Sequence, residues 1–229
     1  MLKYKTTYSL LVVSTVFVYT VRAQEVYVGI GAENAYFKNY LNNLGANTLD
    51  LSYSKPLDFF LETGFTSSVF NDRLQYDVGF TYNKYEISTG FFVNNVSIPL
   101  KYNLTYISIK AGLQYAIVDR NRFSFNIHSH ISKDWLIEGK SSFLDVINNL
   151  YEDNTFDKTL ISFHAGASFN YQISENTTIY MCYNNSNSFI EEYQDSNPEE
   201  KYSLSRNAFS TGIIFKLNTR RLKCYGGLF

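Results

Sequence analysis

The chain alternates between apolar and polar residues with a period of two, and this alternation constrains its fold more than any other feature. In residues 106–115 the odd positions are all apolar or aromatic, while Ser, Lys, Gly and Gln occupy the even positions 108–114. Successive side chains of a β-strand point to opposite faces, so this segment is predicted to form a strand with two unlike faces. Nine further segments show the same pattern: 26–33, 49–54, 59–66, 74–83, 96–103, 123–131, 161–171, 178–183 and 209–217.

The ten segments predict an all-β protein rather than a helical one. No stretch after residue 23 approaches the roughly 18 consecutive apolar residues of a membrane-spanning helix. A chain of this kind could cross a membrane only as a closed barrel, because in lipid every backbone group needs an internal partner. We therefore expect a closed, antiparallel, up-and-down transmembrane barrel of about ten strands. Pro99 cannot donate to a strand ladder, so it should mark a bulge or a strand end; if 93–103 is a loop, the count becomes eight.

Residues 1–23 are predicted to be a secretory signal peptide. Lys3 and Lys5 precede an apolar run from Leu10 to Tyr19, and Ala23 offers a cleavage site. The run is near ten residues, against the roughly 20 that a membrane-spanning helix needs. The expected organisation is a signal peptide cleaved after Ala23, a barrel over 24–218 and a C-terminal tail over 219–229.

Composition excludes several other classes of protein. Aromatic residues make up 17% of the 229 residues and the net charge is -1, which is unlike a disordered chain. The 20 Lys and Arg residues do not exceed the 21 Asp and Glu residues, so no nucleic-acid partner is expected. Cys182 and Cys224 lack the spacing of metal ligands; export would permit a disulfide between them, but Cys182 falls in a predicted strand and Cys224 in the tail.

The segments that connect the predicted strands differ in length. Short connections are expected at 54–58, 119–122 and 172–176, and long polar loops at about 34–46, 136–158 and 187–206. Short turns at one end and long loops at the other are typical of outer-membrane barrels. Residues Ser142 to Tyr151 could form a short helix within their loop.

A soluble β-sandwich also alternates, so other features have to separate it from a barrel. The polar faces carry many glycines and few Lys or Glu residues, which suits the crowded interior of a narrow barrel. Aromatic residues also gather near segment ends, as the interfacial girdles of a membrane barrel require. The residues assigned to these girdles are Tyr82, Tyr102, Tyr106, Phe123, Trp135, Tyr171 and Tyr183.

On these features the mature chain resembles the small outer-membrane β-barrel proteins of Gram-negative bacteria, including the opacity-type and porin-fold barrels. The resemblance rests on the signal peptide, on strand textures such as 109–115 and 97–102, and on the closing strand 208–217. The chain departs from the family in continuing from Thr219 to Phe229, so either Phe215 or Phe229 would be the closing aromatic residue. The resemblance implies an outer-membrane location, lipid as the surrounding partner, insertion by the barrel-assembly machinery and a monomer.

The predicted inward face carries charged and histidine side chains that are expected to pair with one another. They are Glu33, Asp50, Glu62, Asp77, Asp134, Lys101, Lys110, Lys216, His128, His130 and His164. His130, Ser132 and Asp134 share one strand face and are the candidate catalytic residues, because a hydrolase needs a nucleophile, a base and a group that orients the base. A packed polar interior explains the same residues without chemistry, so they are expected to be structural, with no metal and no cofactor.

The function expected from the sequence is that of an outer-membrane barrel with a plugged polar interior. Its role would be structural or interactive and would be carried by the long external loops. Two alternatives remain open from the sequence: a barrel-embedded lipid hydrolase or protease, and a soluble periplasmic β-sandwich that acts as a binding module.

Overall fold

The computed structural model describes residues 24–41, 49–50, 56–69, 73–93, 96–143, 146–152, 156–189 and 201–217. The predicted signal peptide, the tail after Leu217 and Cys224 lie outside these residues. Within the described part, no helix is long and apolar enough to cross a membrane.

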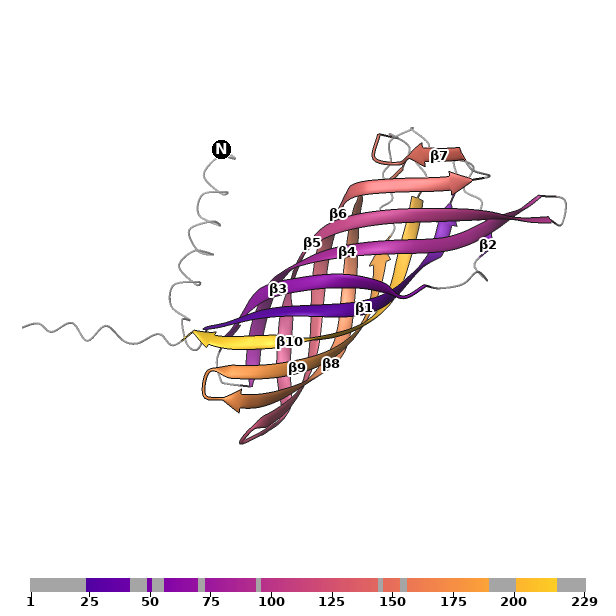
Figure 1. The fold of residues 1–229 in the computed structure, drawn as a ribbon. Coiled ribbons are helices and arrows are strands. Elements are labelled where there is room, and N and C mark those ends of the chain that lie inside the picture. Colours follow the sequence, from indigo (N-terminus) through magenta and orange to yellow (C-terminus); the bar gives the residue numbers. More distant parts are fainter. Residues whose placement is uncertain are drawn as a thin grey trace, which may run out of the picture.

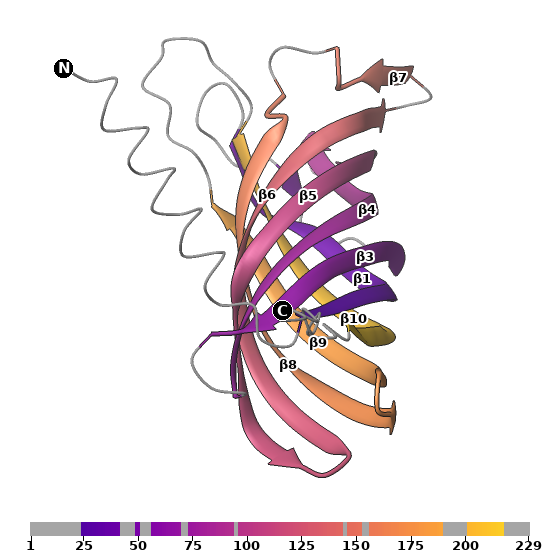
Figure 2. The same ribbon diagram turned by 90° about the vertical axis from the view of Figure 1, so that its left-hand side faces the viewer.

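Eight long antiparallel strands form a ring (Figures 1 and 2). Each pairs with the next along the chain, and the last pairs with the first from Gln24↔Leu217 to Leu41↔Lys201, which closes the ring. These strands are β1 (Gln24–Leu41), β3 (Asp58–Ser68), β4 (Leu74–Val93), β5 (Val96–Arg120), β6 (Phe123–Phe143), β8 (Thr159–Ser174), β9 (Thr177–Phe189) and β10 (Lys201–Leu217).

Two short strands extend the sheet at one rim: β2 (Leu49–Asp50) pairs with β4, and β7 (Val146–Asn149) pairs with β6. The described sheet therefore has ten strands. Eight of them form the closed ring, which is the alternative number of strands expected from the sequence. The predicted segments 96–103 and 106–115 merge into the single strand β5, which accounts for much of the difference. Closure of the ring excludes the two-layer β-sandwich, so that alternative is wrong.

Pro99 lies inside β5, opposite Gly90 of β4, and the register shifts of β5 fall elsewhere. The prediction of a bulge or a strand end at Pro99 is wrong. Pairing between β5 and β6 begins only at Leu100, so β5 has a single neighbour at Pro99. Proline is compatible with such a position, where one side of the strand has no neighbouring ladder.

The two ends of the barrel differ. Short turns join β3 to β4, β5 to β6 and β8 to β9 at the end where β1 begins and β10 finishes, which we call the turn end. At the opposite end, the far end, the strands continue well into the regions predicted as loops. β1 reaches Leu41, β6 reaches Phe143 and β10 starts at Lys201, so the described residues 34–41, 136–143 and 201–206 of the predicted loops are strand.

The short helix predicted for 142–151 is also absent. Residues 146–149 instead form β7, which pairs with Lys140 to Phe143 and makes a hairpin beside β6 (Figure 1). All four residues of β7 are exposed, so the apolar face of a helix at this position would have no surface to pack on.

Over the turn-end half of the barrel, the side chains point as the alternation predicts. Ile107, Ile109 and Leu113 are 39–51% exposed on the outside of β5, whereas Ser108 and Lys110 are buried inside. Five of the seven predicted girdle residues also face outward: Tyr82, Phe123, Trp135, Tyr171 and Tyr183. These outward side chains form an apolar band around the barrel, which we call the lipid-facing band.

Beyond Tyr82 and Trp135 the polarity of the two faces inverts. On β5 the even-numbered positions stay inward across this change, so Tyr102 and Tyr106 share the inward face of Ser108 and are almost fully buried. Lys101 is exposed on the outside. The girdle positions of both tyrosines and the inward position of Lys101 were therefore predicted wrongly. A barrel segment that leaves lipid for water needs an apolar interior and a polar outside, and this segment has both.

Inward glycines make room for large side chains from neighbouring strands. A β-carbon at Gly64 would overlap the Tyr27 ring, one at Gly79 would overlap the Tyr27 hydroxyl, and one at Gly29 would overlap the Tyr180 hydroxyl. The predicted role of these glycines in relieving interior crowding is confirmed. Tyr27 and Tyr180 themselves meet edge to face, with ring centroids 6.1 Å apart.

Candidate functional site in the barrel lumen

Three zones follow one another along the lumen: an apolar cluster at the far end, a polar centre, and a hollow at the turn end. The apolar cluster, which we call the aromatic closure, brings together buried residues of six ring strands and the β7–β8 connection. Its members are Ala35, Phe37, Tyr40, Tyr85, Ile87, Tyr102, Leu104, Tyr106, Leu136, Leu150, Phe156, Leu160, Tyr202 and Leu204.

Aromatic rings contact one another across the closure. Phe37 of β1 lies edge to face with Tyr102 of β5 and Tyr202 of β10, at centroid distances of 5.0 and 5.3 Å. The Tyr106 and Tyr202 hydroxyls are hydrogen-bonded at 2.5 Å, and the Tyr202 hydroxyl donates to the Asp157 carbonyl oxygen at 2.7 Å. These contacts fill the lumen from opposite walls of the barrel.

The polar centre is organised around Asp134, which is 1% exposed. Ser132 Oγ donates to one Asp134 carboxylate oxygen at 2.8 Å, and Ser162 Oγ donates to the other at 2.8 Å. Arg206 forms an ion pair with the same carboxylate at 3.2 Å. A buried carboxylate with two hydroxyl donors and a guanidinium is satisfied in its charged form.

Arg206 joins Asp134 to two more strands. Its Nε donates to Ser186 Oγ of β9, and its Nη1 donates to the Tyr85 hydroxyl of β4, each at 2.8 Å. The sequence interpretation missed Arg206 because it placed this residue in a loop. A signal was present, since Arg206 shares the even-numbered, inward face of Gly212 and Ser210.

The three candidate catalytic residues are not brought together as a triad. His130 turns away from Ser132 and lies 3.2 Å from Asp77 Oδ1, while the imidazole beside Ser132 belongs to His164, at 2.9 Å. A hydroxyl has one proton, which Ser132 gives to Asp134, so His164 donates to Ser132 Oγ. In a triad the histidine accepts the serine proton and the carboxylate orients the histidine. Here Ser132 stands between the other two groups.

A second polar group, nearer the turn end, surrounds Lys110 and Glu62, and we call it the Lys110 cluster. Lys110 Nζ lies 2.8 Å from one Glu62 oxygen, and the Tyr180 hydroxyl donates to the other oxygen at 2.9 Å. His128 Nε2 is 2.6 Å from Asn184 Oδ1. The predicted pairing of inward charges is confirmed for Glu62 with Lys110 and for Asp134, whose partner is Arg206.

Other predicted inward residues have different positions. Glu33 is buried, and one of its carboxylate oxygens has no hydrogen-bond partner. Lys216 is inward at the turn-end rim, 3.9 Å from Glu25, and the Asp50 side chain lies outside the described residues. Buried Cys182 accepts from Asn184 Nδ2 at 3.1 Å. Among the described side chains, no three metal-ligating groups converge on one point.

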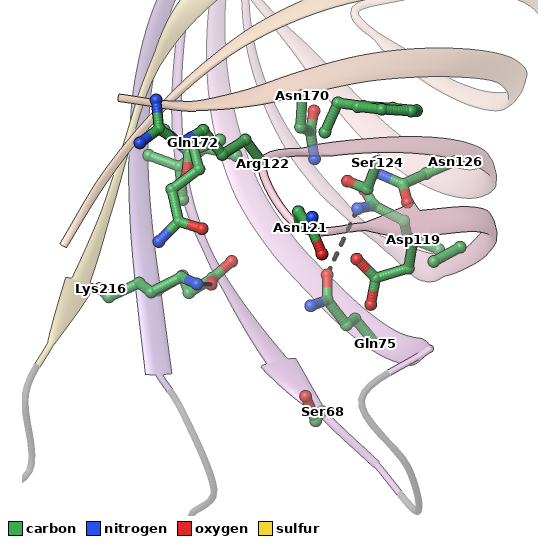
Figure 3. Close-up of a pocket in the computed structure, with 16 residues that line it drawn as sticks. Ser68, Gln75, Asp119, Asn121, Arg122, Ser124, Asn126, Asn170, Gln172 and Lys216 are labelled. Atoms are coloured by element: carbon green, nitrogen blue, oxygen red, sulfur yellow. Dashed lines mark hydrogen bonds and ion pairs between the residues drawn. The ribbon is translucent and has the colours of Figure 1, made fainter. Parts of the chain in front are cut away.

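The turn end of the lumen holds a polar cavity of about 350 Å³, which we call the vestibule (Figure 3). Side chains from several ring strands and from the β5–β6 turn line it, and Gln75, Asn126, Asn170 and Lys216 are among them. A deeper cavity of about 60 Å³ shares Gln75 and Asn170 with the vestibule and reaches His130 and Lys110. The hollow therefore extends from the turn end to the Lys110 cluster.

Comparisons with solved structures agree with this architecture. The outer membrane protein OprG from Pseudomonas aeruginosa is 12% identical, with a TM-score of 0.50 over 86% of this chain and 97% of OprG. The fold is that of an outer-membrane β-barrel. Neisserial surface protein A is 14% identical, with a TM-score of 0.48 over 84% of this chain and 97% of its own. For Ail, the attachment invasion locus protein of Yersinia pestis, the identity is 14% and the TM-score 0.44, over 86% of this chain and 100% of Ail.

Searches by sequence find no matching family model and no curated relative. The likeness to OprG therefore lies in the fold. It confirms the predicted fold class and the resemblance on which that prediction rested.

Proposed function

We propose that this protein is an outer-membrane barrel with a closed lumen, which acts through the part of the barrel beyond the lipid-facing band. The observation that carries the proposal is the aromatic closure, in which rings from β1, β5 and β10 pack across the lumen at the far end. A barrel of eight strands has an interior just wide enough for side chains to fill. Buried aromatic rings across one end therefore support a lumen that is closed to ions.

The orientation follows from the two ends of the barrel. In outer-membrane barrels short turns face the periplasm and long connections face outward. The far end, with the aromatic closure, would then lie outside the cell, and the vestibule would open toward the periplasm. We further propose cleavage of the signal peptide after Ala23, insertion by the barrel-assembly machinery and a monomer surrounded by outer-membrane lipid.

The strands β4, β5 and β6, together with β7, form an outer extension that continues past the lipid-facing band (Figure 1). Its outward side chains include Lys84, Glu86, Lys101, Glu138 and Lys140. Lys140 Nζ lies 2.7 Å from Glu138 Oε1, and this contact lowers the pKa of the Glu138 carboxyl. Such a charged, hydrated surface on a rigid sheet supports a structural or interactive role outside the membrane.

The absence of a conducting path is testable in planar lipid bilayers. We expect the purified barrel to give no stepwise ion conductance at neutral pH, because the aromatic closure blocks the far end. The double variant Phe37→Gly/Tyr202→Gly removes two rings that are in contact across the closure, and it should conduct if it still folds. Regular conductance steps from the unaltered protein, of the size seen with water-filled pores, would refute the closed lumen.

We also propose that His130, Ser132 and Asp134 are structural instead of catalytic, since the Ser132 proton is committed to Asp134. Ser132→Ala should lower the free energy of unfolding by about 1–3 kcal/mol, because a buried carboxylate loses one donor. Urea unfolding of the folded barrel measures this change. Lipid or peptide hydrolysis by the pure protein that disappears in Ser132→Ala would instead establish the hydrolase alternative.

A further inference from the structure

The vestibule has a lining that is rich in neutral hydrogen-bonding groups. Nine of its sixteen lining residues are carboxamides or hydroxyls, so neutral polar groups dominate its wall. The six carboxamides come from four ring strands and the β5–β6 turn, and several of them are labelled in Figure 3: Gln75, Gln114, Asn121, Asn126, Asn170 and Gln172.

These carboxamides are only loosely engaged with the protein itself. Gln114 Nε2 donates to Gln75 Oε1 at 3.3 Å, and Asn126 Nδ2 donates to Ser168 Oγ at 3.4 Å. Asn170 Oδ1 is buried and has no hydrogen-bond partner. The bonds around Asp134, by comparison, are mostly 2.8 Å long. Long and missing hydrogen bonds leave donor and acceptor capacity in the vestibule wall for another molecule.

The charged groups of the vestibule do not favour ligands of either sign. Two acidic side chains, Glu25 and Asp119, stand against two basic ones, Arg122 and Lys216. Glu25 and Lys216 lie within ion-pair distance at 3.9 Å. At the inner end, Lys110 is already paired with Glu62. The formal charge of the lining is therefore balanced, so no net field concentrates an ionic ligand there.

We propose that the vestibule binds a neutral saccharide of one or two rings. A carboxamide offers a donor and an acceptor side by side, which matches the paired donor and acceptor capacity of sugar hydroxyls. Ala116 and Ile214 add apolar surface to the wall, against which the C–H face of a sugar ring can pack. The volume of about 350 Å³ falls within the range of small-molecule pockets, at its smaller end. This proposal is independent of the interaction role of the outer extension.

The experiment is a titration of the full chain, folded in a zwitterionic detergent because glycoside detergents would occupy the site. The probes are maltose and N,N′-diacetylchitobiose, with citrate and spermidine as charged comparators. Side-chain amide signals of Asn and Gln, followed by NMR, report on the wall directly. We expect the neutral disaccharides to shift the Gln75, Gln114 and Asn170 signals saturably, and the charged probes to leave them in place.

Gln114→Leu keeps the side chain nearly the same size but removes one donor and one acceptor from the wall. It should weaken disaccharide binding by about tenfold, as expected for the loss of one hydrogen-bonding group. Asn103→Leu, on the outer face of the same strand, is the matched control and should bind like the unaltered protein. Unperturbed vestibule amides in the unaltered protein, stronger binding of a charged probe, or full binding by folded Gln114→Leu would each overturn the proposal.

Discussion

Replacing Asp134 with Ala should destabilise the folded barrel by about 3–5 kcal/mol, because it leaves the buried charge of Arg206 without its counterion. Asp134 is 1% exposed, and its carboxylate also receives the hydroxyl protons of Ser132 and Ser162. The three donors to Asp134, which are Ser132, Ser162 and Arg206, are all buried in the lumen. Equilibrium unfolding in urea, with the barrel folded into lipid vesicles, measures the loss.

A matched control separates burial from charge. Glu138 is also a carboxylate in an ion pair on β6, but it lies on the exposed outer face, where solvent screens the pair. Glu138→Ala should therefore leave the unfolding curve unchanged. An Asp134→Ala barrel as stable as Glu138→Ala would show that Asp134 and Arg206 do not interact as the geometry indicates.

The double variant Asp134→Leu/Arg206→Met tests the same pair by removing both of its charges. Removing both charges leaves no uncompensated ion, so the double variant should be more stable than Asp134→Ala. If the losses of stability in the single variants Asp134→Leu and Arg206→Met sum to the loss in the double variant, the two residues do not pair directly.

The sequence predicts the barrel well where the barrel crosses lipid. The odd residues of 107–115 and the even residues beside them lie on the faces that the alternation assigns. Gly64 and Gly79 face the crowded lumen for the reason given from the sequence alone. In this zone the outside is apolar and the inside polar, so hydrophobicity identifies the face.

The same rule fails at the far end because the solvent outside the barrel changes. Phe37 and Leu204 are buried in the lumen there, and Lys101 is outside. An interpretation that assigns apolar residues to lipid puts these positions on the wrong face, or treats the segment as a loop. On β6 a register shift adds to the difficulty, since the extra residue Ile137 exchanges the two faces of that strand.

The polar centre was predictable as a set of inward residues but not as a set of contacts. His128, His130, Ser132 and Asp134 do share the inward face of β6. Their partners come from other strands: Asp77 from β4, His164 from β8 and Arg206 from β10. Strand order and register decide these pairings, and a single sequence shows neither.

The inversion of polarity along β5 leads to a second large effect. Leu113 is 51% exposed at the outer face, in the middle of the lipid-facing stretch of the strand. Leu113→Arg should lower the stability of the inserted barrel by about 2–4 kcal/mol, because a charged side chain near the bilayer midplane is poorly solvated. Asn103 occupies the outer face of the same strand, ten positions nearer the far end, where Lys101 is also exposed. Asn103→Arg should therefore have no measurable effect. Urea titration of both variants in lipid vesicles gives the comparison. Equal losses of stability would mean that the lipid-facing band is not confined to the part of β5 between Tyr106 and the turn end.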